Sequence, residues 1–162
     1  MTTTTDKMVA LARALREKEL TIVDSDCLAR SKLDFSEISL IEVDSYLATL
    51  HRKHRREDVV ADPRFEGTAA GLGAYVGEVM RRKRPAEIEW ASFDEMKAIV
   101  PEAARFVEDA PPFIREFNLM RGKQLAWPGA KVLKFVENGA VDSVAYFASV
   151  MLTDGPSIPD GQ

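Results

Sequence analysis

An apolar stretch that contains four glycines places the strongest constraint on how this chain can fold. It lies between Pro63 and Pro85, and its apolar side chains recur at helical spacing, at Phe65, Ala69, Leu72, Val76 and Val79. The glycines in it are Gly67, Gly71, Gly73 and Gly77. Each glycine inside a helix costs up to about 1 kcal/mol relative to alanine. We therefore expect a helix from about Pro63 to Arg84 whose glycines allow another backbone to approach closely, either within the chain or in a homodimer formed through residues 67–77.

The two ends of the chain limit the part that folds. The N-terminus has no basic region followed by an apolar core, and no stretch reaches the roughly 18 apolar residues of a membrane span. Residues 154–162 are turn and helix-breaking residues, which predicts a disordered tail. We expect one globular domain over residues 1–153. Its first helix should run from about Asp6, as N-cap, to Leu20.

A second helix is predicted by a start signal at Asp34. Asp34 and Glu37 have the spacing of a capping box, and Leu33 and Ile38 could close a hydrophobic staple around it. The helix should end in the basic run 51–56, where cations stabilise a helix C-terminus. Because a short link joins it to the glycine-rich helix, the two should form an antiparallel helical hairpin.

The second half of the chain changes to strand patterns. Residues 86–90 alternate polar and apolar side chains, as in a half-buried strand. Ser92 and Glu95 form another capping-box pattern, which should open a short helix. After an extended linker at Pro111–Pro112, we expect a hairpin with strands over residues 113–120 and 124–127.

The last segment allows two interpretations. Pro128 can open a helix, and Asn138–Gly139 then breaks the pattern. An Asn-Gly pair is also typical of a tight hairpin, so residues 131–147 could instead be two strands. We favour helix–turn–helix, because Val141 to Leu152 keep a helical apolar face. The expected fold is mainly helical α+β, with the helical hairpin and a small antiparallel sheet of two to three strands flanked by C-terminal helices.

Short motifs in this half point to one group of proteins. They are the run Leu72 to Val79, with its form L-G-x-Y-x-G-E, then Trp90, and then the Asn138–Gly139 turn with Asp142-Ser143-Val144. Over about residues 63–150 the chain resembles small bacterial domains of unknown function. That resemblance implies a glycine-containing helix, a Trp-bearing strand and a closing helix–turn–helix. It implies no catalytic residue.

Composition excludes several classes of protein. With 46% hydrophobic and 30% charged residues, the chain is neither disordered nor fibrous. Its one cysteine, Cys27, excludes an internal disulfide and a site built from several thiolates, and fits a reducing compartment. We expect a soluble, cytoplasmic protein that does not bind membranes. The net charge of −4 gives no general attraction to nucleic acid.

Two basic clusters interrupt this acidic balance. They contain Arg52, Lys53, Arg55 and Arg56 in one case, and Arg81, Arg82, Lys83 and Arg84 in the other. Each ends a predicted helix, and the antiparallel hairpin would place them at opposite ends. No aromatic residues interleave with them to stack bases. A weak nucleic-acid site formed by segments 51–56 and 81–84 is therefore an alternative hypothesis and not the favoured one.

No combination of residues gives a clear catalytic, cofactor or metal site. His51 and His54 share a helix face, but Asp58 lies too far along the axis to complete a metal site with them. Glu78 lies on an otherwise apolar helix, so that, if buried, it should pair with Arg81 or Arg82. We favour a non-catalytic protein-interaction or accessory module. The alternative is a small hydrolase that uses Glu78 with His51 or His54.

Overall fold

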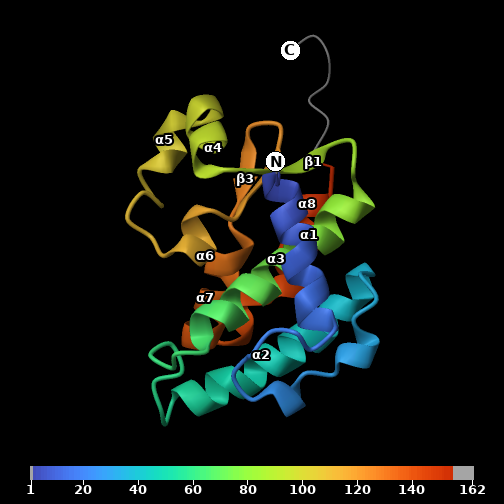
Figure 1. Cartoon of the computed structure of the whole chain (residues 1–162), viewed down its shortest axis with the longest axis vertical. Helices are drawn as coiled ribbons and strands as arrows, with labels where there is room; N and C mark the ends of the chain where they lie inside the picture. The colour runs from blue at the N-terminus through green and yellow to red at the C-terminus, as the bar shows by residue number, and fades with distance from the viewer. Residues whose placement is uncertain (1, 155–162) are drawn as a thin grey trace.

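The computed structural model describes residues 2–154, so most of the predicted tail at 154–162 lies outside the described residues. Figure 1 shows a mainly helical α+β fold with a small antiparallel sheet at one end, as predicted. The helices are α1 (Thr4–Arg16), α2 (Leu40–His54), α3 (Phe65–Lys83), α4 (Phe93–Ile99), α5 (Pro101–Ala104), α6 (Pro112–Arg115), α7 (Pro128–Asn138) and α8 (Val144–Leu152). The strands are β1 (Ile88–Ala91), β2 (Asn118–Arg121) and β3 (Gln124–Ala126). Single 3-10 turns lie at Ser25–Cys27, Arg30–Lys32, Glu37–Ser39 and Ala140–Asp142.

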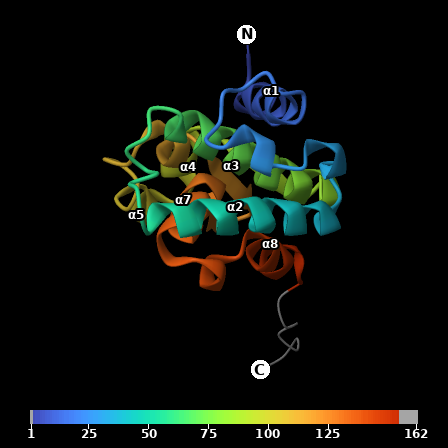
Figure 2. The ribbon, with the colours of Figure 1, turned by 90° about the horizontal axis from the view of Figure 1, so that it is seen from below.

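The glycine-rich helix α3 is the centre of the molecule. Every residue from Gly71 to Met80 is buried, including the polar side chain of Glu78. Helix α1 packs on one side of α3, and α7 and α8 pack on the other, where α2 makes its main helix contacts with α7 and α8 rather than with α3 (Figure 2). A helix that is apolar on all faces needs such neighbours all round.

The glycines of α3 allow neighbours from the same chain to approach closely. Another backbone does so at Gly73, as predicted, whereas side chains do so at Gly71 and Gly77. A Cβ atom at Gly77 would lie 2.2 Å from the ring of Trp90, and one at Gly73 would lie 3.0 Å from the backbone of Gly129 in α7. At Gly71 it would lie 2.8 Å from the Leu20 side chain. Residues 71–77 are covered within one chain and leave no free surface there. A homodimer through residues 67–77 stays a prediction.

The sheet has the order β1-β2-β3 with both pairs antiparallel. Trp90 pairs with Leu119, and Leu119 pairs with Ala126 on its other side. The hairpin prediction is confirmed for β2 and β3, but the strand predicted from Phe113 begins only at Asn118. The prediction of an extended linker at Pro111–Pro112 is also wrong in part, because Pro112 is the first residue of α6. Proline is tolerated there, since the N–H of a first helical residue has no partner within the helix.

Two predicted helix starts differ from the structure. Thr3 is the N-cap of α1, and Asp6 is its third helical residue, whose carboxylate accepts a hydrogen bond from the Thr3 amide. Asp34 accepts hydrogen bonds from Ser36, and Ser36 caps the 3-10 turn that precedes α2. The predicted capping box at Asp34 and the staple at Ile38 are therefore wrong.

The capping box at Ser92 and Glu95 is confirmed, with both reciprocal hydrogen bonds present. The helix–turn–helix is also confirmed, because α7 ends at Asn138 and Gly139 adopts a positive φ of 89° before α8. Strands over residues 131–147 are excluded, since α7, a 3-10 turn and the start of α8 occupy this segment.

Candidate functional site

The buried carboxylate of Glu78 belongs to an ion-pair network. Arg81 donates two hydrogen bonds to it, at 2.5 and 2.9 Å, and the indole nitrogen of Trp90 donates a third at 3.0 Å. Arg82 lies 3.5 Å from the same carboxylate. Burial alone would raise the pKa of Glu78, but the hydrogen bonds from Arg81 and Trp90 and the two positive charges hold it below its ordinary value. Glu78 therefore stays ionised and acts as the partner of Arg81.

The structure does not bring Glu78 together with His51 or His54. Near the other end of α2, His51 donates from Nδ1 to the Val136 carbonyl at 2.8 Å, and His54 accepts from the Val59 amide at 3.2 Å. The part of α3 near Glu78 contacts the start of α2, because the Tyr75 hydroxyl lies 2.7 Å from that of Ser39.

Since His51 follows Ser39 by twelve residues, it lies about 18 Å further along α2. The geometry therefore gives no support to a hydrolase site that uses Glu78 with either histidine. The described residues also contain no group of three or more His, Cys, Asp or Glu side chains placed to hold a metal ion.

The second basic cluster is used mainly within the fold. Besides pairing with Glu78, Arg82 places its guanidinium 3.6 Å from the centre of the Phe35 ring. Arg84 donates to the Leu152 carbonyl at 2.9 Å. Of the four residues from Arg81 to Arg84, Lys83 is the one for which the structure shows no ion pair. The cluster therefore leaves little free charge for a partner.

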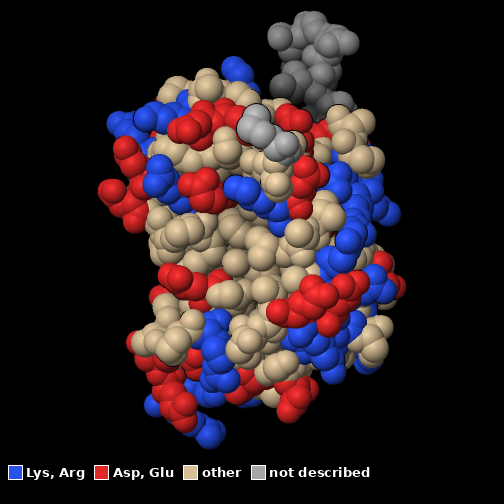
Figure 3. Space-filling model, in the orientation of Figure 1, with Lys and Arg blue, Asp and Glu red and all other residues tan. Residues whose placement is uncertain are grey.

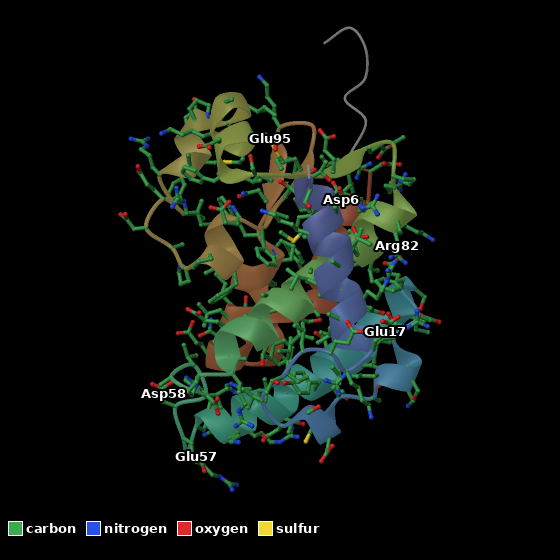
Figure 4. All side chains as sticks on the ribbon, viewed as in Figure 1. Asp6, Glu17, Glu57, Asp58, Arg82 and Glu95 are labelled. Carbon is green, nitrogen blue, oxygen red and sulfur yellow. The ribbon has the colours of Figure 1, made fainter. Side chains whose placement is uncertain are left out.

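The first basic cluster remains open to solvent. Lys53 pairs with Asp24 at 3.0 Å, while Arg52, Arg55 and Arg56 line a hollow of about 370 Å³. The turn at Glu57–Asp58 that follows this cluster lies at the lower left of Figure 4, and Arg82 lies at the right. The two clusters thus lie apart, as expected, and do not form one continuous basic surface.

An exposed apolar surface extends over α2 and α8, and we call it the α2/α8 surface. Ile38, in the 3-10 turn before α2, is 73% exposed, and Ile41, in the first turn of α2, is 57% exposed. Tyr146 and Val150 on α8 are 69% and 50% exposed. Between the two helices lies a hollow of about 370 Å³, lined by Glu37, Ile38, Ile41 and Ala145. Clustered apolar side chains with this exposure are typical of an interaction site.

Helix α8 is held at both ends by charged side chains from other elements. At its N-terminus, Asp44 of α2 accepts hydrogen bonds from the Val144 amide at 2.8 Å and the Ser143 hydroxyl at 2.6 Å. At its C-terminus, Arg84 and Arg121 donate to the last carbonyls. Both sets of charges complement the helix dipole, so the apolar helix is fixed beside α2 with its outer face free.

No motif in the sequence marks the α2/α8 surface. From the sequence alone, Ile38 and Ile41 are ordinary apolar residues of a predicted helix. The residues of α8 that lie beside them follow about a hundred positions later. The signal that could have found them is the composition of residues 144–152, nearly all of which are apolar. A nine-residue helix with apolar residues on every face cannot bury all of them at the edge of a fold.

Comparisons of the chain with protein-family models, with curated proteins and with solved structures gave no match. The resemblance to bacterial domains over residues 63–150 therefore stays a prediction. Within residues 2–154, no helix combines the length and the apolar character that crossing a membrane requires.

Proposed function

We propose that this chain is a non-catalytic protein-interaction module that binds its partner through the α2/α8 surface. The observation that carries the proposal is the exposure of Ile38 and Ile41, which line one hollow together with Ala145 of α8, and of Tyr146 and Val150 on the same helix α8. Fully burying an exposed isoleucine or valine side chain contributes roughly 1.5–3 kcal/mol, and these partly exposed side chains forgo the corresponding part of it. A partner that covers the surface gains that free energy on binding.

The chemistry of the hollow selects an amphipathic helix as the partner. Glu37 is the one charged residue that lines it, beside Ile38, Ile41 and Ala145. A helix with apolar residues at spacings of three and four could place them in the groove between α2 and α8. A Lys or Arg at the edge of that helix would pair with Glu37.

Photo-cross-linking in the native cells tests the proposal. Tyr146→p-benzoylphenylalanine places the reactive group on the surface, and cross-linked chains are identified by mass spectrometry. We expect a partner segment with apolar residues at helical spacing and a basic flank. Ile41→Asp should abolish that cross-link, because it places a carboxylate in the apolar hollow beside Glu37.

Ile99→Asp is the matched control, since Ile99 is 48% exposed on α4, outside the α2/α8 surface. The cross-link should survive in this variant. Equal loss in both variants, or persistence in Ile41→Asp, would contradict the proposal. A second copy of the chain as the cross-linked product would show self-association and would replace the proposed partner.

A further inference from the structure

A further hollow, on another face than the α2/α8 surface, has the composition of a small-ligand site. It measures about 320 Å³ and lies between α1, α3 and the segment that begins with α6. Figure 3 shows a broad surface without charged side chains across this side of the molecule, with charged residues above and below it. Ligand sites in proteins are typically concave, mostly apolar and of this volume or larger.

Small residues of α3 form the floor of the hollow, at Gly67 and Ala70. Gly67 differs from the other glycines of α3 in what surrounds it. A Cβ at Gly67 would make only an ordinary contact of 3.5 Å with the Thr21 carbonyl, whereas a Cβ at Gly77 would overlap the Trp90 ring. No described element fills the space beside this part of α3, so the small residues leave an open floor.

Two aromatic side chains form one wall and are already fixed in place. Phe113 packs edge-on against Phe65, with ring centres 5.9 Å apart, and Phe117 packs edge-on against Trp90 at 6.3 Å. Both rings are less than a tenth exposed. A ligand would therefore meet a preformed aromatic wall and would not have to order it.

One carboxylate gives the hollow its charge preference. Glu66 lines it, is exposed, and makes no ion pair or side-chain hydrogen bond with any described residue. An unpaired carboxylate beside aromatic rings favours a cation, which gains both Coulomb attraction and contact with the rings. The apolar residues that line the hollow, in turn, favour a ligand that also carries an apolar group.

We propose that this hollow binds small organic amines that carry one aromatic group, with the ammonium beside Glu66 and the aromatic group against Phe113 and Phe117. The proposal is independent of the α2/α8 surface, because the two sites share no residue. Either can fail without the other.

Titration of the ¹⁵N-labelled protein with tryptamine, followed by NMR, tests this site. We expect saturable shifts of the Gly67 and Ala70 amides, with a dissociation constant in the low-millimolar range or tighter. Tryptophol, which has a hydroxyl in place of the ammonium, should bind more weakly. Glu66→Gln should weaken tryptamine binding by about two- to fivefold, as expected for a solvent-exposed ion pair, and leave tryptophol binding unchanged.

Ala70→Leu should remove binding of both compounds, because the larger side chain occupies the floor. Glu37→Gln is the matched control, since that glutamate lines the other hollow, and tryptamine binding should be unchanged. Thermal unfolding confirms that each variant is folded. Absence of saturable shifts, equal affinity for the alcohol, or full tryptamine affinity in Glu66→Gln would overturn the proposal.

Discussion

The indole of Trp90 makes two contacts with consecutive residues of α3. Its nitrogen donates a hydrogen bond to the Glu78 carboxylate at 3.0 Å, and its six-membered ring occupies the space that a side chain at Gly77 would need. A strand residue thereby joins the sheet to the central helix through one polar and one apolar contact. These two contacts of Trp90 explain why a buried acid, Glu78, follows a glycine, Gly77, in the same helix.

Glu78→Gln should lower stability in a pH-dependent way. At pH 7 we expect a loss of roughly 2 kcal/mol in the free energy of unfolding, because the amide has no negative charge and replaces one of the two oxygens that accept from Arg81 by a donor. The pKa of Glu78 is lowered in the folded state, so its stabilisation is complete above its ordinary value of 4.5 and is lost as the pH falls through the lower, folded value.

Urea unfolding of both proteins between pH 7 and pH 3 measures this effect. The difference in stability between wild type and Glu78→Gln should be constant near neutral pH and should shrink below about pH 4.5. A difference that stays the same down to pH 3 would mean that the carboxylate does not stabilise the fold through its charge.

Alanine substitutions at two glycines of α3 should have opposite effects. Gly77→Ala should lower the free energy of unfolding by about 1–3 kcal/mol, since its methyl group overlaps the Trp90 ring. Gly67→Ala should raise it by about 0.5–1 kcal/mol, because the new methyl makes only an ordinary contact and alanine favours the helix. Chemical denaturation of the two variants side by side checks both signs.

Local signals in the sequence predicted the elements that depend on them. Pro85 and the spacing of apolar residues gave α3 nearly its observed bounds, and Ser92 with Glu95 marked the start of α4. Where two local signals competed, the outcome depended on tertiary packing. Pro112 could begin a helix or continue an extended linker, and it begins α6, whose Phe113 carbonyl packs against Gly129 of α7.

The candidate surfaces were harder to predict, because they join distant segments. Local spacing predicts that Ile38 closes a hydrophobic staple, but the Ser36 hydroxyl donates to the Asp34 carboxylate, and Ile38 projects into solvent. The α2/α8 surface depends on Asp44 meeting the start of α8 a hundred residues later. No spacing rule for a helix or a strand connects such positions.

The loop before α2 is anchored at Val23 by two buried side chains. The Tyr46 hydroxyl donates to the Val23 carbonyl at 2.5 Å, and the Val23 amide donates to the Thr68 hydroxyl at 3.0 Å. Burial raises the pKa of Tyr46 above its ordinary value of 10.0, so the hydroxyl keeps its proton. Tyr46→Phe should lower stability by about 1–2 kcal/mol, because it leaves a buried carbonyl without its donor.

Hydrogen exchange tests where this loss occurs. The Val23 amide should exchange faster in Tyr46→Phe, beyond the change expected from the global loss of stability. Amides of α8, which the hydroxyl does not contact, should follow the global change alone and serve as the internal control. Uniform acceleration over the whole chain would contradict a local anchoring role for Tyr46.

Asp44→Ala should release the N-terminus of α8 and disturb the α2/α8 surface without changing any of its apolar side chains. Three groups, the Val144 and Ala145 amides and the Ser143 hydroxyl, lose their acceptor. Loss of a helix cap typically costs about 1–2 kcal/mol. Amide exchange should therefore accelerate in the first turn of α8, and cross-linking from Tyr146 should weaken because α8 no longer holds a fixed position beside Ile41.

Ser149→Ala is the control, since its hydroxyl bonds only to the Tyr146 carbonyl within α8, and it should leave both measurements unchanged. Full cross-linking in Asp44→Ala, with α8 amides that exchange faster, would show that the partner does not need a fixed α8.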